Sequence, residues 1–286
     1  MSSLLVETAP AKINLTLRVV GRREDGYHEL ESLVAFAAVA DRLGLEPDGK
    51  PALAISGPFA DACGPVDDNL VLRAARALGE RIGNLKAGRF RLEKNLPVAA
   101  GIGGGSADAG AALRLLARAN DLAPDDARLA SAALATGADV PVCLDPRPRV
   151  MRGIGDLLSE PVTVPRIDAV LANPGVPLST RDVFVRLAGS RGSGASLGDV
   201  PAGLEALISF LGAHGNDLTE AAVACSGAVS DLLAALRALP GARLARMSGS
   251  GPTCFALFAT ADEASAAARL LAAANRDWWV CATTIG

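Results

Sequence analysis

The chain has 286 residues, half of them hydrophobic and only 3% aromatic, so aliphatic side chains must fill the core of one large domain or two smaller ones. The net charge of −3 argues against a general nucleic-acid-binding protein, and the longest apolar run, residues 33–40, is too short to span a bilayer. The five cysteines are scattered and form no CxxC pair, and the first residues do not resemble a signal peptide. Both features predict a cytoplasmic protein with reduced thiols.

Apolar residues occupy every second position from Ile13 to Val19, which predicts a strand within residues 4–20. Lys12 and Asn14 share the other face of this strand. They can line a cleft there, although the period alone favours an ordinary solvated face.

A polar turn over residues 21–28 precedes a second strand, residues 29–40, and carries Tyr27 and His28. Such a pair beside a cleft can stack on a base and bond its edge. Packing of the tyrosine on its own hairpin is the structural alternative, and the local sequence does not decide between them.

Residues 41–54 predict a loop and then a strand, and residues 70–82 have the apolar spacing of a helix that Asp68 or Asn69 caps. A short strand follows at residues 89–92. Lys94, Asn95 and Pro97 interrupt it.

Four glycines come next, at positions 101, 103, 104 and 105, and Ser106, a favourable N-cap residue, opens a helical run rich in Ala and Leu. Strand, glycine loop and helix start together favour a phosphate site, because glycine amides and the helix N-terminus both attract anions. The loop lacks the Gly-Lys-Ser/Thr of a Walker A sequence and is a poor dinucleotide fingerprint. A flexible linker is the alternative, but the apolar runs on both sides argue against it.

Residues 124–135 predict a further helix, and Asp139 lies between its end and an apolar, strand-like run over residues 140–144. A carboxylate in that position is more often a cap or turn residue than a catalyst. On chemistry alone three aspartates fit the role of a catalytic base, and the residues themselves do not separate them.

The last part of the chain predicts a strand at residues 167–172, a short helix that carries Thr180 and Phe184, and a mobile, lid-like loop over residues 188–203. Residues 216–218 cap a further helix, and the helical pattern continues from Ser230 to Leu239. A second glycine turn, residues 246–252, leads into a buried strand, and a helix over 261–274 and a strand over 279–284 close the chain. The extended region 161–177 marks the boundary between domains 1–160 and 161–286.

Three blocks together resemble the GHMP kinases, the family of galacto-, homoserine, mevalonate and phosphomevalonate kinases. They are residues 10–15, the glycine loop from Pro97 to Ser106, and residues 248–252. Shorter motifs, at residues 25–28, 137–142, 153–155 and 174–184, resemble the members that phosphorylate a cytidine diphosphate-linked methylerythritol in non-mevalonate isoprenoid synthesis.

The resemblance implies an ATP-dependent kinase that phosphorylates the 2-hydroxyl of this small molecule, with Mg²⁺ held chiefly by the nucleotide and water rather than by a protein metal site. Asp139 would accept the hydroxyl proton, and Lys12 would steady the charge beside it. Tyr27 and Phe184 would sandwich the cytosine, His28 would bond its edge, and Asn14 and Thr180 would touch the same substrate. The implied nucleotide-binding residues are Asn69, Lys94, Pro97, Gly101, Gly103, Gly104, Gly105 and Ser106.

The resemblance also implies an α+β fold of two domains. The N-terminal domain would resemble the second domain of ribosomal protein S5, and the C-terminal domain would be ferredoxin-like, with the active site in the interdomain cleft. The expected partner is a small molecule, with no nucleic acid and no membrane, and the expected state is a monomer or weak homodimer.

Two rival interpretations remain open. Another GHMP kinase with a mevalonate-type or sugar substrate would have no base to stack on Tyr27 and Phe184. A non-catalytic binding module on the S5-like scaffold would need a basic face, which the acidic balance disfavours. A serine hydrolase is the weakest alternative, because the chain has only two histidines, His28 and His214, from which to build a Ser-His-Asp triad.

Overall fold

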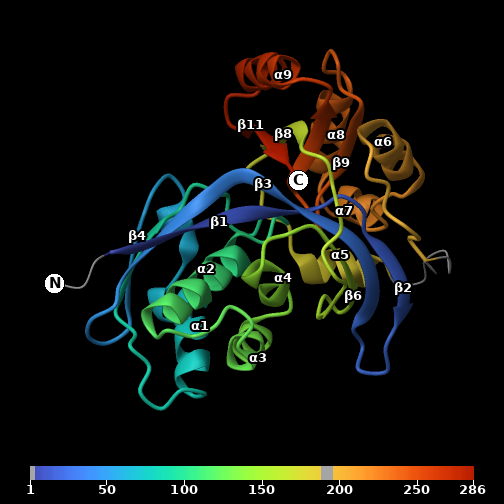
Figure 1. Ribbon diagram of the computed structural model, residues 1–286. Helices are drawn as coiled ribbons and strands as arrows, with labels where there is room; N and C mark the ends of the chain where they lie inside the picture. The colour runs from blue at the N-terminus through green and yellow to red at the C-terminus, as the bar shows by residue number, and fades with distance from the viewer. Residues whose placement is uncertain (1–3, 188–195) are drawn as a thin grey trace. The chain divides into compact units, whose positions relative to one another are not determined.

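The computed structural model describes residues 4–187 and 196–286, and the chain divides into two compact units (Figure 1). The first contains the chain up to Ala11 with residues 40–98 and 103–146. The second contains residues 12–39, 99–102 and everything from Arg147 on. The first half of the loop expected to be lid-like, residues 188–195, lies outside the described residues, and the boundary predicted after residue 160 stays a prediction.

The first unit combines a small sheet with a group of four helices. Strand β5 (Arg89–Glu93) pairs in parallel with β4 (Ala52–Ser56) and antiparallel with the end of β3 (His28–Glu46). The helices are α1 (Leu70–Gly79), α2 (Gly104–Ala119), α3 (Ala127–Thr136) and α4 (Val140–Leu144), which pack on one another (Figure 1). Two short 3₁₀ turns, Ala60–Cys63 and Val66–Asp68, precede α1.

The close packing of α2 on α4 requires Gly110. A Cβ at this position would lie 2.4 Å from the carbonyl oxygen of Cys143, which no relaxed side chain tolerates. Residues 140–144 form a short buried helix, so the strand expected from their apolar run is wrong. Apolar runs of five residues do not distinguish a buried helix from a buried strand.

The second unit contains β2 (Arg18–Arg22), the beginning of β3, β6 (Arg149–Gly153) and β7 (Leu157–Leu158), all paired antiparallel. Strand β1 (Leu5–Asn14) contributes residues to both units. The single strand expected over residues 4–20 is thus two strands, β1 and β2. They are separated near Leu17, whose N–H donates to the carbonyl of Gly215 instead of continuing a ladder.

The rest of the second unit is an antiparallel sheet in the order β11–β8–β10–β9, with helices between its strands. The strands are β8 (Ile167–Asn173), β9 (Leu244–Met247), β10 (Cys254–Phe258) and β11 (Trp279–Ile285). The helices are α5 (Thr180–Arg186), α6 (Leu204–Ala213), α7 (Thr219–Cys225), α8 (Gly227–Arg237) and α9 (Ala261–Ala274).

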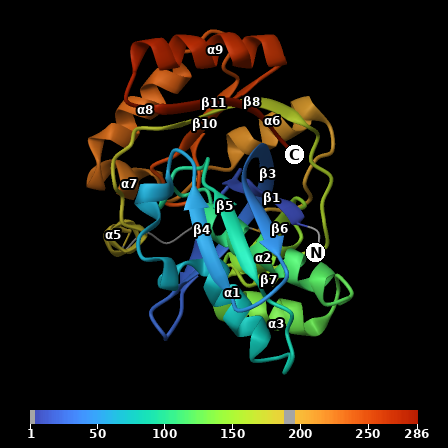
Figure 2. The same ribbon diagram turned by 90° about the vertical axis from the view of Figure 1, so that its left-hand side faces the viewer.

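This strand order and the β–α–β–β–α–β succession are those of the expected ferredoxin-like arrangement. Helix α9 packs over β8 and β11 (Figure 2), and α8 packs on β9 and β10. All five residues of β10 are buried, which matches their uninterrupted apolar sequence. Helix α6 was not predicted, because its sequence is apolar on most sides and follows a Gly- and Ser-rich stretch. Within the described residues, no helix combines the length and apolar character that crossing a bilayer requires.

Candidate active site

The polar side chains of the first sequence block are buried, so the solvated-face interpretation of Lys12 and Asn14 is wrong. Lys12 is 4% exposed and Asn14 is 1% exposed. The side-chain amide of Asn14 donates to Oγ of Ser32 at 2.7 Å, while its Oδ1 is buried without a hydrogen-bond partner in the described chain. A buried acceptor without a donor is costly, so this atom is suited to a ligand that brings one.

In the second unit the three sequence blocks meet at residues 99–102. The N–H of Lys12 donates to the carbonyl of Ile102 at 2.9 Å, and the N–H of Asn14 donates to Oγ of Ser248 at 3.1 Å. Ser248 in turn donates to the carbonyl of Gly101 at 3.1 Å. Parts of the chain more than 140 residues apart are thus held together through the Ser248 hydroxyl.

Gly101 is required for this meeting. Its φ is +74°, and a Cβ there would lie 2.5 Å from the carbonyl oxygen of Gly251. Asn216 stabilises the second glycine turn. Its side-chain amide donates to the carbonyls of Met247 and Gly249, each at 2.8 Å. The loop that contains Gly101 is therefore packed against the second glycine turn and is not a flexible linker.

Helix α2 begins at the end of the glycine loop, in the first unit. Gly103 is the N-cap with φ +60°, and α2 starts at Gly104, so Ser106 lies in the first turn instead of capping the helix as expected. The reason is that the left-handed conformation of Gly103 starts the helix three residues earlier. The first-turn amides, those of Gly104, Gly105 and Ser106, have no partner within a helix and are free to bind an anion.

Lys94 lies beneath this first turn in a buried charge cluster. Its ammonium donates to Asp108 at 2.6 Å and also to Asp41, whose other oxygen accepts the N–H groups of Asn95 and Leu96. Burial alone would lower the pKa of Lys94, but the two carboxylates outweigh it and raise this pKa. Burial raises the pKa of Asp108 to about 7.

The remaining nucleotide-binding candidates of the first unit have visible structural roles. Asn69 caps α1, because its side chain accepts the N–H of Val71 at 3.0 Å. Pro97 is buried in the loop before the glycines. The ammonium of Lys94 is engaged by carboxylates, so a contact between this residue and adenosine stays a prediction, as do those of Asn69 and Pro97.

Asp139 is half-buried at the N-terminal end of α4, in the first unit. Its side chain makes no capping hydrogen bond to that helix, which removes the simplest structural explanation for a carboxylate in this position. Lys12 belongs to the second unit, and the pairing of the two side chains stays a prediction. Within the described residues, no three or more His, Cys, Asp or Glu side chains group so as to hold a metal ion.

The second unit contains a cavity of about 580 Å³ that brings together four of the five predicted substrate residues. Tyr27, His28, Thr180 and Phe184 line it, and the rings of His28 and Phe184 stack with centroids 5.1 Å apart and planes inclined by 25°. Tyr27 is 62% exposed, so its ring is available to a ligand. The alternative interpretation, that the Tyr27 ring packs on its own hairpin, does not agree with this exposure.

The polar edge of the cavity connects to the second glycine turn. The hydroxyl of Thr180 lies 2.7 Å from the hydroxyl of Ser250. Burial, and then the charge of Arg22, lower the pKa of His28, which favours its neutral imidazole. A neutral imidazole carries one donor and one acceptor, as recognition of the edge of a pyrimidine requires.

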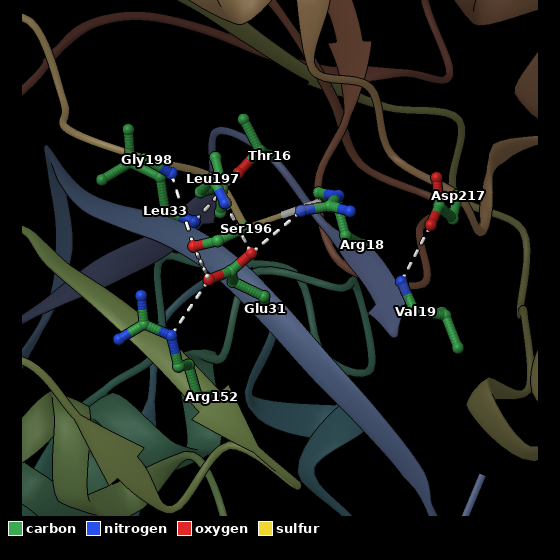
Figure 3. A network of polar contacts seen from close by, with 10 residues as sticks. All are labelled: Thr16, Arg18, Val19, Glu31, Leu33, Arg152, Ser196, Leu197, Gly198 and Asp217. Atoms are coloured by element: carbon green, nitrogen blue, oxygen red, sulfur yellow. Dashed lines mark hydrogen bonds and ion pairs between the residues drawn. The ribbon is translucent and has the colours of Figure 1, made fainter. Parts of the chain in front are cut away.

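A buried carboxylate, Glu31, links β2, β3 and β6, the strands that carry or precede the cavity-lining residues Arg22, Leu30 and Ile154. Glu31 accepts hydrogen bonds from Arg18 at 3.0 Å and Arg152 at 3.0 Å, and from Ser196 and the N–H of Leu197 (Figure 3). Burial opposes ionisation of Glu31, but these hydrogen bonds outweigh it and hold its pKa below the usual range. Two residues close to this network line the cavity. Leu30 precedes Glu31 in β3, and Ile154 directly follows β6.

Several residues at these sites were not singled out from the sequence. Asp108 had a detectable signal, since it is an acidic residue within the Ala- and Leu-rich run of α2. Asp41 and Glu31 had none, because single acids in a long strand resemble ordinary surface residues. The others are Ser32 and the additional cavity-lining residues Arg22, Leu30, Ile154, Arg181 and Val185, while Asn216 was expected only as a helix cap.

Comparison with known proteins defines the class. Residues 69–145 match the GHMP kinases N terminal domain and residues 201–277 match the GHMP kinases C terminal model. The crystal structure of a 4-(cytidine 5'-diphospho)-2C-methyl-D-erythritol kinase superposes with a TM-score of 0.79 at 35% identity, and covers 99% of both chains. A homoserine kinase from Cytophaga hutchinsonii, at 20% identity and a TM-score of 0.74, shows the same fold.

The chain therefore belongs to the GHMP kinase family, and the α+β, two-domain fold implied by its motifs is confirmed. A curated relative from Rhodopseudomonas palustris (strain BisB5) is 56% identical and covers 96% of this chain and 97% of its own length. One from Methylobacterium radiotolerans is 55% identical and covers 98% of this chain and 99% of its own length. Both are named 4-diphosphocytidyl-2-C-methyl-D-erythritol kinase.

Proposed function

We propose that this protein transfers the terminal phosphoryl group of ATP to the 2-hydroxyl of 4-diphosphocytidyl-2-C-methyl-D-erythritol, in non-mevalonate isoprenoid synthesis. The observation that carries the proposal is the aromatic cavity of the second unit. Its stacked His28 and Phe184, with the exposed ring of Tyr27, match a flat pyrimidine base. Mevalonate and sugar substrates have no such base, which disfavours the rival kinases.

The phosphates of ATP bind at the glycine loop in this proposal. The amides of Gly104, Gly105 and Ser106 at the start of α2, with the positive end of that helix, provide the donors. Phosphoryl transfer requires mainly positioning and charge stabilisation, which such a site supplies. Gly101 and Gly103 shape the loop.

Asp139 accepts the proton of the attacking hydroxyl, and Lys12 stabilises the negative charge on that oxygen. Asn14 and Thr180 position the same substrate, since the unpartnered Oδ1 of Asn14 offers an acceptor for a hydroxyl. Ser106, in the first turn of α2, offers a hydroxyl oxygen of the kind that Mg²⁺ prefers. Mg²⁺ bound with ATP would neutralise charge on the phosphate oxygens, held chiefly by the nucleotide and water.

A cytoplasmic location is part of the proposal and is supported by the five cysteines, which are free thiols. Action as a monomer or weak homodimer on a small molecule, without nucleic acid or membrane, completes it.

A coupled assay of ADP release tests the proposal. The cytidine substrate, mevalonate and galactose are offered separately with ATP and Mg²⁺. We expect saturable turnover with the cytidine substrate and none above background with the other two. Turnover with mevalonate or galactose alone would identify a different GHMP kinase, and no turnover with any of the three would favour a binding module.

A further inference from the structure

The cavity of the second unit has a charged part that the function above leaves unused. Arg22 and Arg181 line it together with the aromatic residues, and none of the described residues that line it is an Asp or a Glu. Two cations without a facing carboxylate repel each other, which an anionic ligand would relieve.

Both guanidinium groups project from elements that also carry the aromatic rings. Arg22 on β2 is the cross-strand partner of His28 on β3, so the two side chains share one face of the hairpin. Arg181, Phe184 and Val185 are spaced i, i+3 and i+4 on α5, and therefore share one face of that helix. The two arginines thus approach the same cavity from two different elements.

Neither arginine forms an ion pair within residues 4–187 and 196–286. The next residue, Arg23, differs in this respect, because its Nε bonds Asp25 at 3.0 Å. The other acids nearby point elsewhere or are occupied. Glu29 and Asp182 follow His28 and Arg181 by one residue and so leave the shared faces, and Asp156 accepts the N–H of Ile154 at 3.1 Å. The charge of Arg22 also helps to keep His28 neutral.

We propose that Arg22 and Arg181 bind the diphosphate of the nucleotide substrate whose base stacks in the same cavity. This inference rests on the proposed function and adds to it two residues that select for a charged, phosphate-bearing pyrimidine over a bare nucleoside. Guanidinium groups suit this role, since they form paired hydrogen bonds with phosphate oxygens.

Steady-state kinetics of Arg22→Gln, Arg181→Gln and the double variant test the inference. We expect each single change to raise KM for the cytidine substrate by about tenfold, as loss of a charge-assisted hydrogen bond does. The double change has a larger effect, while kcat and KM for ATP stay within about twofold. Arg23→Gln and Arg186→Gln are matched controls on the same hairpin and helix, and neither residue lines the cavity. Equal KM values in wild type and double variant would overturn the inference, as would equal effects of the controls.

Inhibition by substrate fragments separates the phosphate contact from the base contact. At saturating ATP, cytidine and CDP compete with the cytidine substrate. The double variant loses affinity for CDP but keeps its affinity for cytidine, and Arg→Lys changes restore part of the loss. If the wild type turns over and binds cytidine, and the double variant binds CDP normally, only this inference fails. If the wild type neither turns over nor binds cytidine, the proposed function fails.

Discussion

The ammonium of Lys94 lies 2.6 Å from a carboxylate oxygen of Asp108, and both side chains are 3% exposed. With Asp41, they form a buried cluster of one cation and two acids beneath the first turn of α2. Such a cluster is sensitive to the loss of a single member, since the remaining charges stay buried without compensation.

We therefore expect Lys94→Met to lower the free energy of unfolding by about 3–5 kcal/mol, measured by urea denaturation. Lys50→Met, at an exposed position, is the control, with an expected change within about 0.5 kcal/mol. Restoration of stability by Asp41→Asn and Asp108→Asn in the Lys94→Met background supports the same cause. A Lys94→Met protein as stable as wild type would show that these ion pairs do not contribute to the free energy of unfolding.

Glu31 gives a pH-dependent prediction. Its pKa is lower in the folded protein than in the unfolded chain, so its stabilising contribution is complete above the unfolded value of 4.5 and is lost as pH falls through the folded value. Glu31→Gln lacks this contribution at every pH. The difference in unfolding free energy between wild type and Glu31→Gln is thus expected to be large at pH 7 and to shrink below pH 4.5. A difference that stays constant from pH 7 to pH 3 would contradict this account.

Gly101→Ala tests the meeting of the sequence blocks. An added Cβ would approach the carbonyl oxygen of Gly251 to 2.5 Å in a left-handed backbone, so one of the two glycine turns must move. We expect a loss of about 2 kcal/mol or more in stability, together with a rise in KM for ATP. Gly212→Ala is the matched control within α6, where nothing lies within 4 Å, and we expect it to stabilise by about 0.5–1 kcal/mol. Equal behaviour of the two variants would exclude the steric argument.

Removal of an aromatic ring tests the base pocket. We expect Phe184→Ala and Tyr27→Ala each to raise KM for the cytidine substrate by about tenfold, because stacking on a base contributes roughly 1–3 kcal/mol. KM for ATP stays near the wild-type value in both variants. Leu270→Ala, which removes an exposed side chain from α9, serves as control. A parallel rise in both KM values would mean that the cavity does not discriminate between the two substrates.

Much of the fold was accessible from the sequence because local and tertiary preferences agree. Helix α9 and strand β8 begin where their periodicity predicts, and Asn69 caps the helix that it precedes. The errors have physical causes. Ser106 is not the N-cap of α2, because Gly103 adopts a left-handed conformation and takes that position. A run of consecutive glycines does not show which of them will do so.

The site was less accessible, because it depends on burial and long-range contact. The alternation around Lys12 and Asn14 resembles a solvated strand, yet both are buried where residues 99–102 and Ser248 meet them. No local pattern reveals a contact between residues more than 140 positions apart. Only the resemblance to a family brought these blocks together in advance, and it did not mark Glu31 or Asp108.

The proposed role of Asp139 as catalytic base is tested most directly by single-turnover and steady-state ADP release in Asp139→Asn with the cytidine substrate. We expect turnover to fall by about 10²-fold or more, while the dissociation constant for ATP stays within about twofold and the exposed-site control Asp125→Asn is unchanged. An Asp139→Asn enzyme that turns over at the wild-type rate would contradict the account.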